Sequence, residues 1–137
     1  MSATTTTMTV IDNDHASLWF HPRKKIVHHQ FHQFVHGQYF REPLEKGAEL
    51  FEKYGAKKWL SDDRGNGALS KEDSDWALGV WQPRVMKAGW KFWAIVMPEK
   101  VIGQMNMRQW AKTYSENGIE VQIFSDPDEA MAWLESQ

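Results

Sequence analysis

The stretch from Trp90 to Pro98, WKFWAIVMP, constrains the fold more than any other part of the chain. It is an apolar run rich in aromatic and β-branched side chains, and a proline closes it. These features are typical of a strand buried on both faces in the middle of a parallel sheet. Segments with helical spacing precede and follow it. The run therefore predicts the centre of a βαβ arrangement, with helices packed on the faces of its sheet.

The remaining segments alternate between strand and helix patterns in an order that fits this centre. Strand-like patterns predict five further strands, at residues 6–11, 16–21, 25–35, 57–62 and 119–124. Apolar residues at helical spacing predict four helices, at residues 40–54, 70–88, 101–114 and 127–134. Pro83 lies inside the second of these patterns, and because proline has no backbone N–H to donate, we expect this helix to kink or split near Gln82.

Three residues mark expected helix ends. Ser70 and Asp126 have side chains that can accept a hydrogen bond from the backbone at the start of the second and fourth helices. Gly55 follows the first helix, where a residue in the left-handed conformation commonly ends a helix. Pro43 is expected only near the start of the first helix. The stripe of the second helix that is expected to be buried consists of Trp76, Val80, Trp81, Val85 and Ala88.

Length and composition fit one domain without covalent cross-links. A chain of 137 residues is long enough to bury roughly two-thirds of the surface that its unfolded form exposes. It has no cysteine, which excludes a disulfide framework and a thiolate zinc site. No repeat or linker interrupts it. We therefore expect a frayed tail at residues 1–5 and a single α/β domain over residues 6–137, with a mixed sheet that begins as an antiparallel hairpin.

Charge and hydropathy exclude several classes of partner. The formal net charge of −2, from 16 basic and 18 acidic residues, produces no strong field that would attract nucleic acid. The N-terminal threonines lack the basic and apolar regions of a signal peptide, and no apolar run is long enough to cross a bilayer. These features predict a cytoplasmic protein that neither inserts into membranes nor binds nucleic acid.

Several stretches carry a resemblance to a known fold. They are KKWLSDD at 57–63, WQPR at 81–84, AGWK at 88–91, VMP at 96–98, FSD at 124–126, EA at 129–130 and WL at 133–134. Together with the order of a strand, a hairpin and three strand-and-helix units, they resemble the SpoIIAA-like fold, which STAS domains share with SEC14-related lipid-binding proteins. The resemblance covers most of residues 16–134.

The resemblance implies a function without catalysis. It favours a bacterial module for protein interaction or regulation, often a homodimer, without a cofactor. STAS antagonists carry a phosphorylatable serine in a loop of the type Asp-Ser-Ser/Thr-Gly before the second helix, whereas residues 62–70 here read DDRGNGALS. That motif is absent. The alternative implied by the SEC14-related members is a binder of a small apolar, lipid-like ligand, which would need a cavity of at least a few hundred Å³ between helices and sheet.

Ligands of open α/β sheets bind beyond the carboxyl ends of the parallel strands. We therefore expect polar contacts to a ligand from Asp62, Asp63 and Arg64, which end one strand. Large apolar side chains of the second and third helices would surround its apolar part. The candidates on these helices are Trp76, Trp81, Met105 and Trp110. In an interaction module all four would be core residues instead.

Two further possibilities involve metals or acid–base chemistry. Asp62, Asp63 and Asp126 could gather at one sheet edge and bind Mg²⁺ or raise one carboxyl pKa, although each is also a common turn or cap residue. Among the histidines, His28 and His32 lie too far apart along one strand to share an ion. His21 could pair with His28 or His29 on a neighbouring strand, but no third ligand is evident. We therefore predict neither a metal site nor a catalytic residue.

Overall fold

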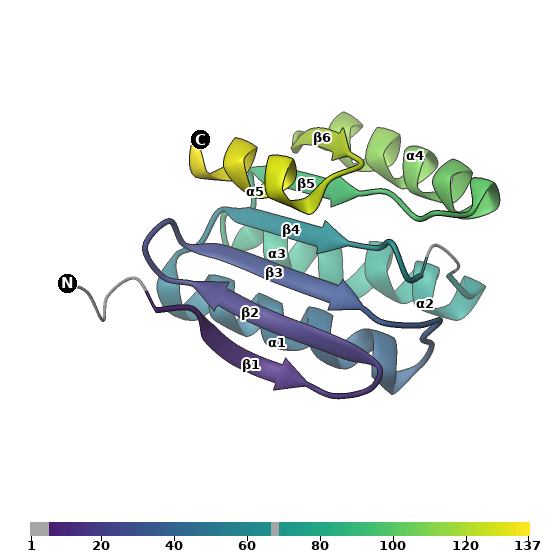
Figure 1. The fold of residues 1–137 in the computed structure, drawn as a ribbon, viewed down its shortest axis with the longest axis horizontal. Coiled ribbons are helices and arrows are strands. Elements are labelled where there is room, and N and C mark those ends of the chain that lie inside the picture. Colours follow the sequence, from purple (N-terminus) through teal and green to yellow (C-terminus); the bar gives the residue numbers. More distant parts are fainter. Residues whose placement is uncertain (1–5, 67–68) are drawn as a thin grey trace.

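The structure, a computed structural model, describes residues 6–66 and 69–137 (Figure 1). The expected tail at residues 1–5 lies outside the described residues. The strands are β1 Met8–Asp12, β2 Ala16–His21, β3 Ile26–Phe31, β4 Lys58–Asp62, β5 Phe92–Val96 and β6 Glu120–Phe124. The helices are α1 Gln38–Tyr54, α2 Lys71–Trp76, α3 Gln82–Lys87, α4 Val101–Glu116 and α5 Pro127–Glu135, and a π-helical turn, η2 Ala77–Trp81, joins α2 to α3. The described chain thus has four helical segments and six strands.

The strands form one mixed sheet in the order of the sequence, β1-β2-β3-β4-β5-β6. The β1–β2 and β2–β3 pairs are antiparallel, and the three following pairs are parallel. The predicted α/β class, the mixed sheet and the N-terminal hairpin are confirmed. No helix among the described residues is long and apolar enough to span a lipid bilayer.

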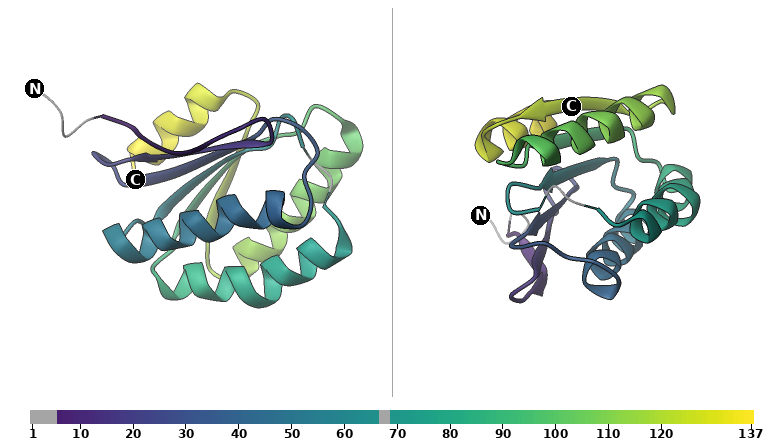
Figure 2. Two further views of the ribbon diagram at one scale, coloured as in Figure 1. Left: turned by 90° about the horizontal axis from the view of Figure 1, so that it is seen from below. Right: turned by 90° about the vertical axis from the view of Figure 1, so that its right-hand side faces the viewer.

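Helices cover both faces of the sheet. α1, the continuous α2–η2–α3 segment and α4 lie on one face, and α5 lies on the other, over β4, β5 and β6 (Figure 2). β5 confirms the prediction for the central run, because Trp93 and Ile95 pack into the core beneath α1, α3 and α4, whereas Ala94 and Val96 pack beneath α5. The parallel strands end at the same edge, which positions the candidate site described below.

Local signals explain most helix boundaries. The Ser70 hydroxyl accepts from the Asp73 amide at 3.2 Å, and the Asp126 carboxylate accepts from the Asp128 amide at 2.9 Å, as expected for the two caps. Gly55 is left-handed, and its N–H donates to the Phe51 carbonyl. The second helix does not split near Gln82: α2, η2 and α3 form one continuous helical segment, and the change from π-helix to α-helix lies directly before Gln82. Pro83 lies in the first turn of α3 and has no N–H to donate.

Several expectations about this helical layer and the second hairpin strand are wrong. Val80 is 60% exposed, because the wider π-helical turn rotates it away from the buried stripe. β3 ends at Phe31 rather than Val35, because its partner β2 begins at Ala16, opposite Phe31. On α4, the first-turn residues Val101 and Ile102 are each 70% exposed, so its apolar residues do not all face the core.

The start of α1 also differs from the expectation. Pro43 lies inside this helix rather than at its beginning, since α1 starts at Gln38. The buried carboxylate of Asp73, on α2, accepts from the Gly37 amide at 3.0 Å and from the Arg41 guanidinium at 3.2 Å. This tertiary contact stabilises the first turn of α1, before Pro43. No local pattern in the sequence predicts the contact.

Candidate functional site

A cavity of about 70 Å³ lies between the helical layer and the carboxyl ends of β3, β4 and β5. Six aromatic side chains line most of it: Phe31, Phe40, Trp81, Trp93, Trp110 and Tyr114. Its polar lining consists of His29, Ser61, Asp63, Asn66 and Asn106. Partly exposed lining residues come from α4 and from the segment before α2, so the cavity reaches the surface between them. This is the place at which open α/β sheets bind ligands.

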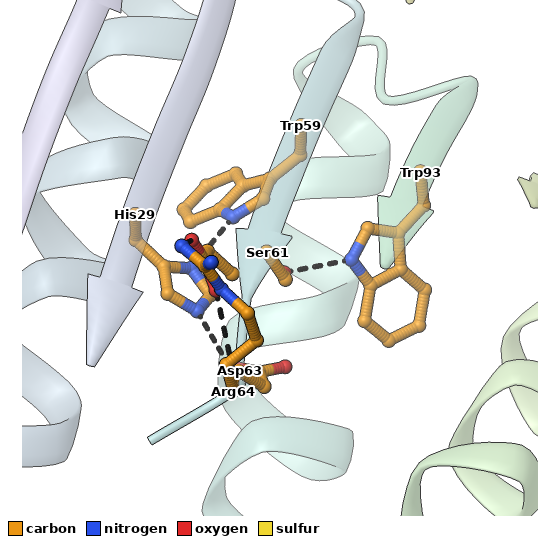
Figure 3. A network of polar contacts seen from close by, with 7 residues as sticks. His29, Trp59, Ser61, Asp63, Arg64 and Trp93 are labelled. Carbon is orange, nitrogen blue, oxygen red and sulfur yellow. Dashed lines mark hydrogen bonds and ion pairs between the residues drawn. The ribbon is translucent and has the colours of Figure 1, made fainter. Parts of the chain in front are cut away.

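A chain of three buried side chains leads into this cavity (Figure 3). The Trp59 indole N–H donates to Nδ1 of His29 at 2.9 Å, and Nε2 of His29 lies 3.0 Å from Oδ1 of Asp63. An indole nitrogen can only donate, so Nδ1 accepts and the ring proton sits on Nε2, which donates to Asp63. In this arrangement the His29 ring carries one proton and no net charge. The contact with Asp63 is therefore a hydrogen bond to a neutral imidazole rather than an ion pair.

The local fold explains how these residues meet. His29 is on β3 and Trp59 is on β4, and both alternate toward the face covered by α1. Asp63 follows the end of β4, where its amide donates to the Val96 carbonyl of β5 at 3.1 Å. That bond continues the sheet by one residue and directs the Asp63 side chain to the cavity side.

Burial dominates the electrostatics of Asp63. The residue is 5% exposed, and removal from water raises the pKa of its carboxyl well above the ordinary value of 3.8. The hydrogen bond from His29 opposes this increase, and the nearby Asp62 adds to it. The ionised form of this carboxyl is therefore disfavoured in the folded protein. Such perturbed groups are often found where a protein binds or transforms a ligand.

Two hydroxyl groups also belong to the wall of the cavity. The Ser61 hydroxyl accepts a 2.8 Å hydrogen bond from the Trp93 indole N–H (Figure 3). The Tyr114 hydroxyl is buried, and it has no hydrogen-bond partner among the described residues. Burial also raises the pKa of this phenol, so it remains protonated. A buried hydroxyl without a partner is uncommon in proteins and costs stability.

Three of the predicted ligand-binding residues line the cavity, namely Asp63, Trp81 and Trp110. The other four do not. Asp62 points to the opposite face of β4, where Arg64 forms two hydrogen bonds to its carboxylate, at 2.9 and 2.7 Å. Trp76 packs against Phe40 and lies under the Arg41 guanidinium. Met105 is 65% exposed on α4. These positions reflect strand alternation and the orientation of α4.

Several cavity residues were not among the ligand-binding residues predicted from the sequence, and His29 and Tyr114 are two of them. A signal existed for His29, which falls on the inward face of its strand together with Val27 and Phe31. A histidine at such a position needs hydrogen-bonding partners, which here are Trp59 and Asp63. Tyr114 has the spacing of an ordinary core residue, and nothing in the sequence distinguishes its hydroxyl.

The described residues contain no group of three or more histidine or acidic side chains that could hold a metal ion. Asp62, Asp63 and Asp126 do not form the acidic cluster considered from the sequence, since each has a different partner. Nε2 of His21 and Nδ1 of His28 lie 3.2 Å apart, as the strand pairing suggested. Burial and the neighbouring His21 lower the pKa of His28 to about 3.

Comparison with models of protein families, with curated proteins and with solved structures returned no match. The SpoIIAA-like resemblance therefore stays a prediction. The fold and the chemistry of the cavity are the basis for proposing a function.

Proposed function

We propose that this chain is a non-catalytic binding domain for a small, mainly apolar molecule held by one polar anchor. The observation that carries the proposal is the aromatic cavity at the carboxyl ends of the parallel strands, with Asp63 fixed in its wall by Trp59 and His29. A few polar groups in a largely apolar pocket are characteristic of ligand sites. The His29 ring, oriented by the hydrogen bond from Trp59, donates to the Asp63 carboxylate and holds it in place before any ligand arrives.

The size of the cavity narrows the choice of ligand. Its volume of about 70 Å³ is smaller than the few hundred Å³ expected for a lipid-like molecule. An engineered cavity of about 150 Å³ in another protein accepts benzene. The present cavity has about half that volume, so we propose a ligand with about three to four non-hydrogen atoms, or a larger ligand that inserts only one end.

The contacts of His29 support binding rather than catalysis. Both of its ring nitrogens are occupied, one by Trp59 and the other by Asp63. A general base needs a free nitrogen within hydrogen-bonding reach of its substrate. The Ser61 hydroxyl is bonded to Trp93, and no bond joins it to His29 among those described. The groups that could form a nucleophile and its base are thus used to position one another and the neighbouring tryptophans.

A substitution that fills the cavity tests this proposal. Ala77 lines it and is buried, so Ala77→Leu places three additional carbon atoms in the space. We expect 2-propanol, isopropylammonium or benzene to shift the indole N–H signals of Trp81 and Trp93 in the NMR spectrum of the unaltered protein. The substitution should abolish these shifts. Ala132→Leu, on an exposed position of α5, is the matched control and should leave them unchanged.

Two results would contradict the proposal. One is the absence of a shift with all three probes, and the other is an equal response in the protein with Ala77→Leu. If this variant does not fold, Leu69→Trp at the partly exposed part of the cavity wall closes the same space and repeats the test.

A second candidate function is the homodimeric interaction module expected from the sequence. The observation that favours it is the surface of β1, β2 and β3 on the side of α5, over which Figure 1 shows none of the described helices. β1 is also an edge strand, and among the described strands its partner is β2. Pairing with β1 of a second copy would satisfy the free backbone groups of both copies, since an antiparallel pair has two-fold symmetry.

We expect native mass spectrometry at near-neutral pH to detect a dimer, and Val10→Lys to convert it to a monomer. Val10 is the central residue of β1, so a symmetric pair would place two lysines opposite each other. Val101→Lys introduces the same charge on α4 and should preserve the dimer. A monomer before any substitution would exclude this interface, and so would equal loss of the dimer in both variants.

A further inference from the structure

We propose that the cavity selects a small organic cation, specifically a primary alkylammonium group on a short aliphatic body. This inference rests on the proposed binding function and specifies the chemistry of the ligand. Three independent features of the cavity carry it: a buried carboxylate and a buried hydroxyl that have, respectively, no cationic partner and no hydrogen bond among the described residues, and a lining of aromatic rings.

The first feature is the charge of Asp63. Within the described part of the chain, the imidazole 3.0 Å from its carboxylate is that of His29, whose ring is neutral when it accepts from Trp59. The guanidinium of Arg64 binds Asp62 at 2.7 Å on the other face of β4. The residues that the structure describes thus place no cationic side chain against this carboxylate. An ionised group in such a position needs a counter-charge, and a bound cation would supply it.

The second feature is the aromatic lining. Trp93 and Trp110 each pack against Tyr114, with ring centroids 4.9 and 5.3 Å apart, on the side of α4. Phe31 and Phe40 form another pair, with centroids 5.8 Å apart, on the side of α1. Cations are attracted to aromatic rings within about 6 Å of the ring centroid, and aromatic cages recognise alkylammonium groups in this way. A carboxylate or phosphate ligand would instead be repelled by Asp63.

The third feature distinguishes a primary ammonium from a quaternary one. Asp63 offers carboxylate oxygens, and the unpartnered Tyr114 hydroxyl offers an oxygen that can accept. A primary ammonium has three N–H donors, whereas a quaternary ammonium has none. Donation to Tyr114 would also satisfy a buried polar atom that has no partner among the described residues. An alcohol of the same shape has one donor and no charge.

The test compares isopropylammonium with 2-propanol, two probes with four non-hydrogen atoms each and nearly the same shape. Binding is followed at pH 8 through the indole N–H signals of Trp81 and Trp93. For ligands of this size we expect a Kd on the order of 1 mM for the cation, and binding at least about 10-fold weaker for the alcohol. Asp63→Asn retains the shape of the side chain and an acceptor for His29. It should weaken cation binding at least about 10-fold and change alcohol binding less than about 3-fold.

Two further variants complete the design. Tyr114→Phe removes only the hydroxyl and should weaken cation binding by about 3- to 10-fold, the effect of one lost hydrogen bond. Asp62→Asn removes a carboxylate from outside the cavity, and because Asp62 acts on Asp63 through its charge and not by contact with the ligand, it should change the affinity for either probe far less than Asp63→Asn does.

The outcomes separate this inference from the proposed function. Equal affinity for the two probes, or cation binding that survives Asp63→Asn, overturns the inference while the binding function stands. Absence of binding by either probe and by benzene overturns both. Tight cation binding that is lost equally in Asp62→Asn would place the cation outside the cavity and would also overturn the inference.

Discussion

Gly47→Ala is expected to lower the free energy of unfolding by about 2 kcal/mol and the melting temperature by roughly 6–10 °C. A methyl group at Gly47 of α1 would lie 2.6 Å from Cζ3 of Trp59 and would also clash with Cη2 of the same ring. Trp59 is fully buried and packs against Phe51 and Trp81, so its indole cannot move aside without displacing other core residues. The greater helix propensity of alanine returns at most about 1 kcal/mol, which is less than the cost of overpacking.

The same substitution at Gly79 is the matched control. Gly79 lies in η2, and a methyl group there would meet no other atom within 4 Å. We expect Gly79→Ala to leave stability unchanged or to raise it by up to about 1 kcal/mol. Chemical denaturation of the three proteins measures both effects. A Gly47→Ala protein as stable as the unaltered one would show that Trp59 is not tightly packed on α1, and the orientation of His29 by Trp59 would then lose its support.

Features that depend on residues close together in the sequence could be predicted. The apolar run around Ile95 became a strand buried on both faces, because its period and composition determine burial locally. Ser70 and Asp126 form the expected caps, since capping involves residues two or three positions away. The irregularity before Pro83 agrees with the missing N–H of proline, although it is a π-helical turn and not a split. These local features were enough for the α/β class and for a mixed sheet that begins as an antiparallel hairpin.

Features that depend on tertiary partners could not be predicted. The start of α1 is held by Asp73, which is 36 residues away from Gly37 in the chain. The exposure of Val80 follows from a π-helical turn that shifts the helical phase by a fraction of a turn, and no local rule indicates its extent.

The candidate site also has features that could be predicted from the sequence and features that could not. Its place at the carboxyl ends of the strands was predictable, and so was the inclusion of Asp63. The chain from Trp59 through His29 to Asp63 spans two strands, and its members are 30 and 34 positions apart. Strand alternation indicates which side chains share a face, but it does not tell which of them will meet. The same limitation explains why Asp62 and Asp63, adjacent in the sequence, serve different faces of the sheet.

Asp63→Asn is expected to make the protein more stable than the unaltered form at pH 8, by about 1–3 kcal/mol, and to give no advantage at pH 4. The physical reason is the raised pKa of the buried Asp63 carboxyl. When the pH rises above 3.8, the unfolded chain releases the proton of this carboxyl first, while the folded protein still holds it. The unfolded state then binds fewer protons, so stability falls until the pH passes the pKa of the folded state. Asparagine has no proton to release and avoids this loss.

The other titrating groups near Asp63 are present in both proteins. His29 from β3 and Tyr114 from α4 line the same cavity, whereas the neighbouring Asp62 lies on the opposite face of β4 and acts on Asp63 through its charge. His28, whose pKa is lowered to about 3, has the opposite effect, since its contribution to stability is present at neutral pH and is lost on acidification. It acts in both proteins, so it cancels when the two unfolding free energies are subtracted at each pH.

The control for this prediction is Asp62→Asn, which removes a carboxylate that is already paired with Arg64. It should lower stability, because the Arg64 guanidinium loses a charged partner, and it should show no gain between pH 4 and pH 8. Urea unfolding of the three proteins across this range gives the differences directly. A constant difference between the unaltered protein and Asp63→Asn would mean that the carboxyl is not destabilised when it ionises. The physical reason for a bound cation in the cavity would then disappear. A gain in the stability of Asp63→Asn at pH 8, together with weaker binding of isopropylammonium, would instead show that the carboxylate that destabilises the folded protein is the group that binds the cation.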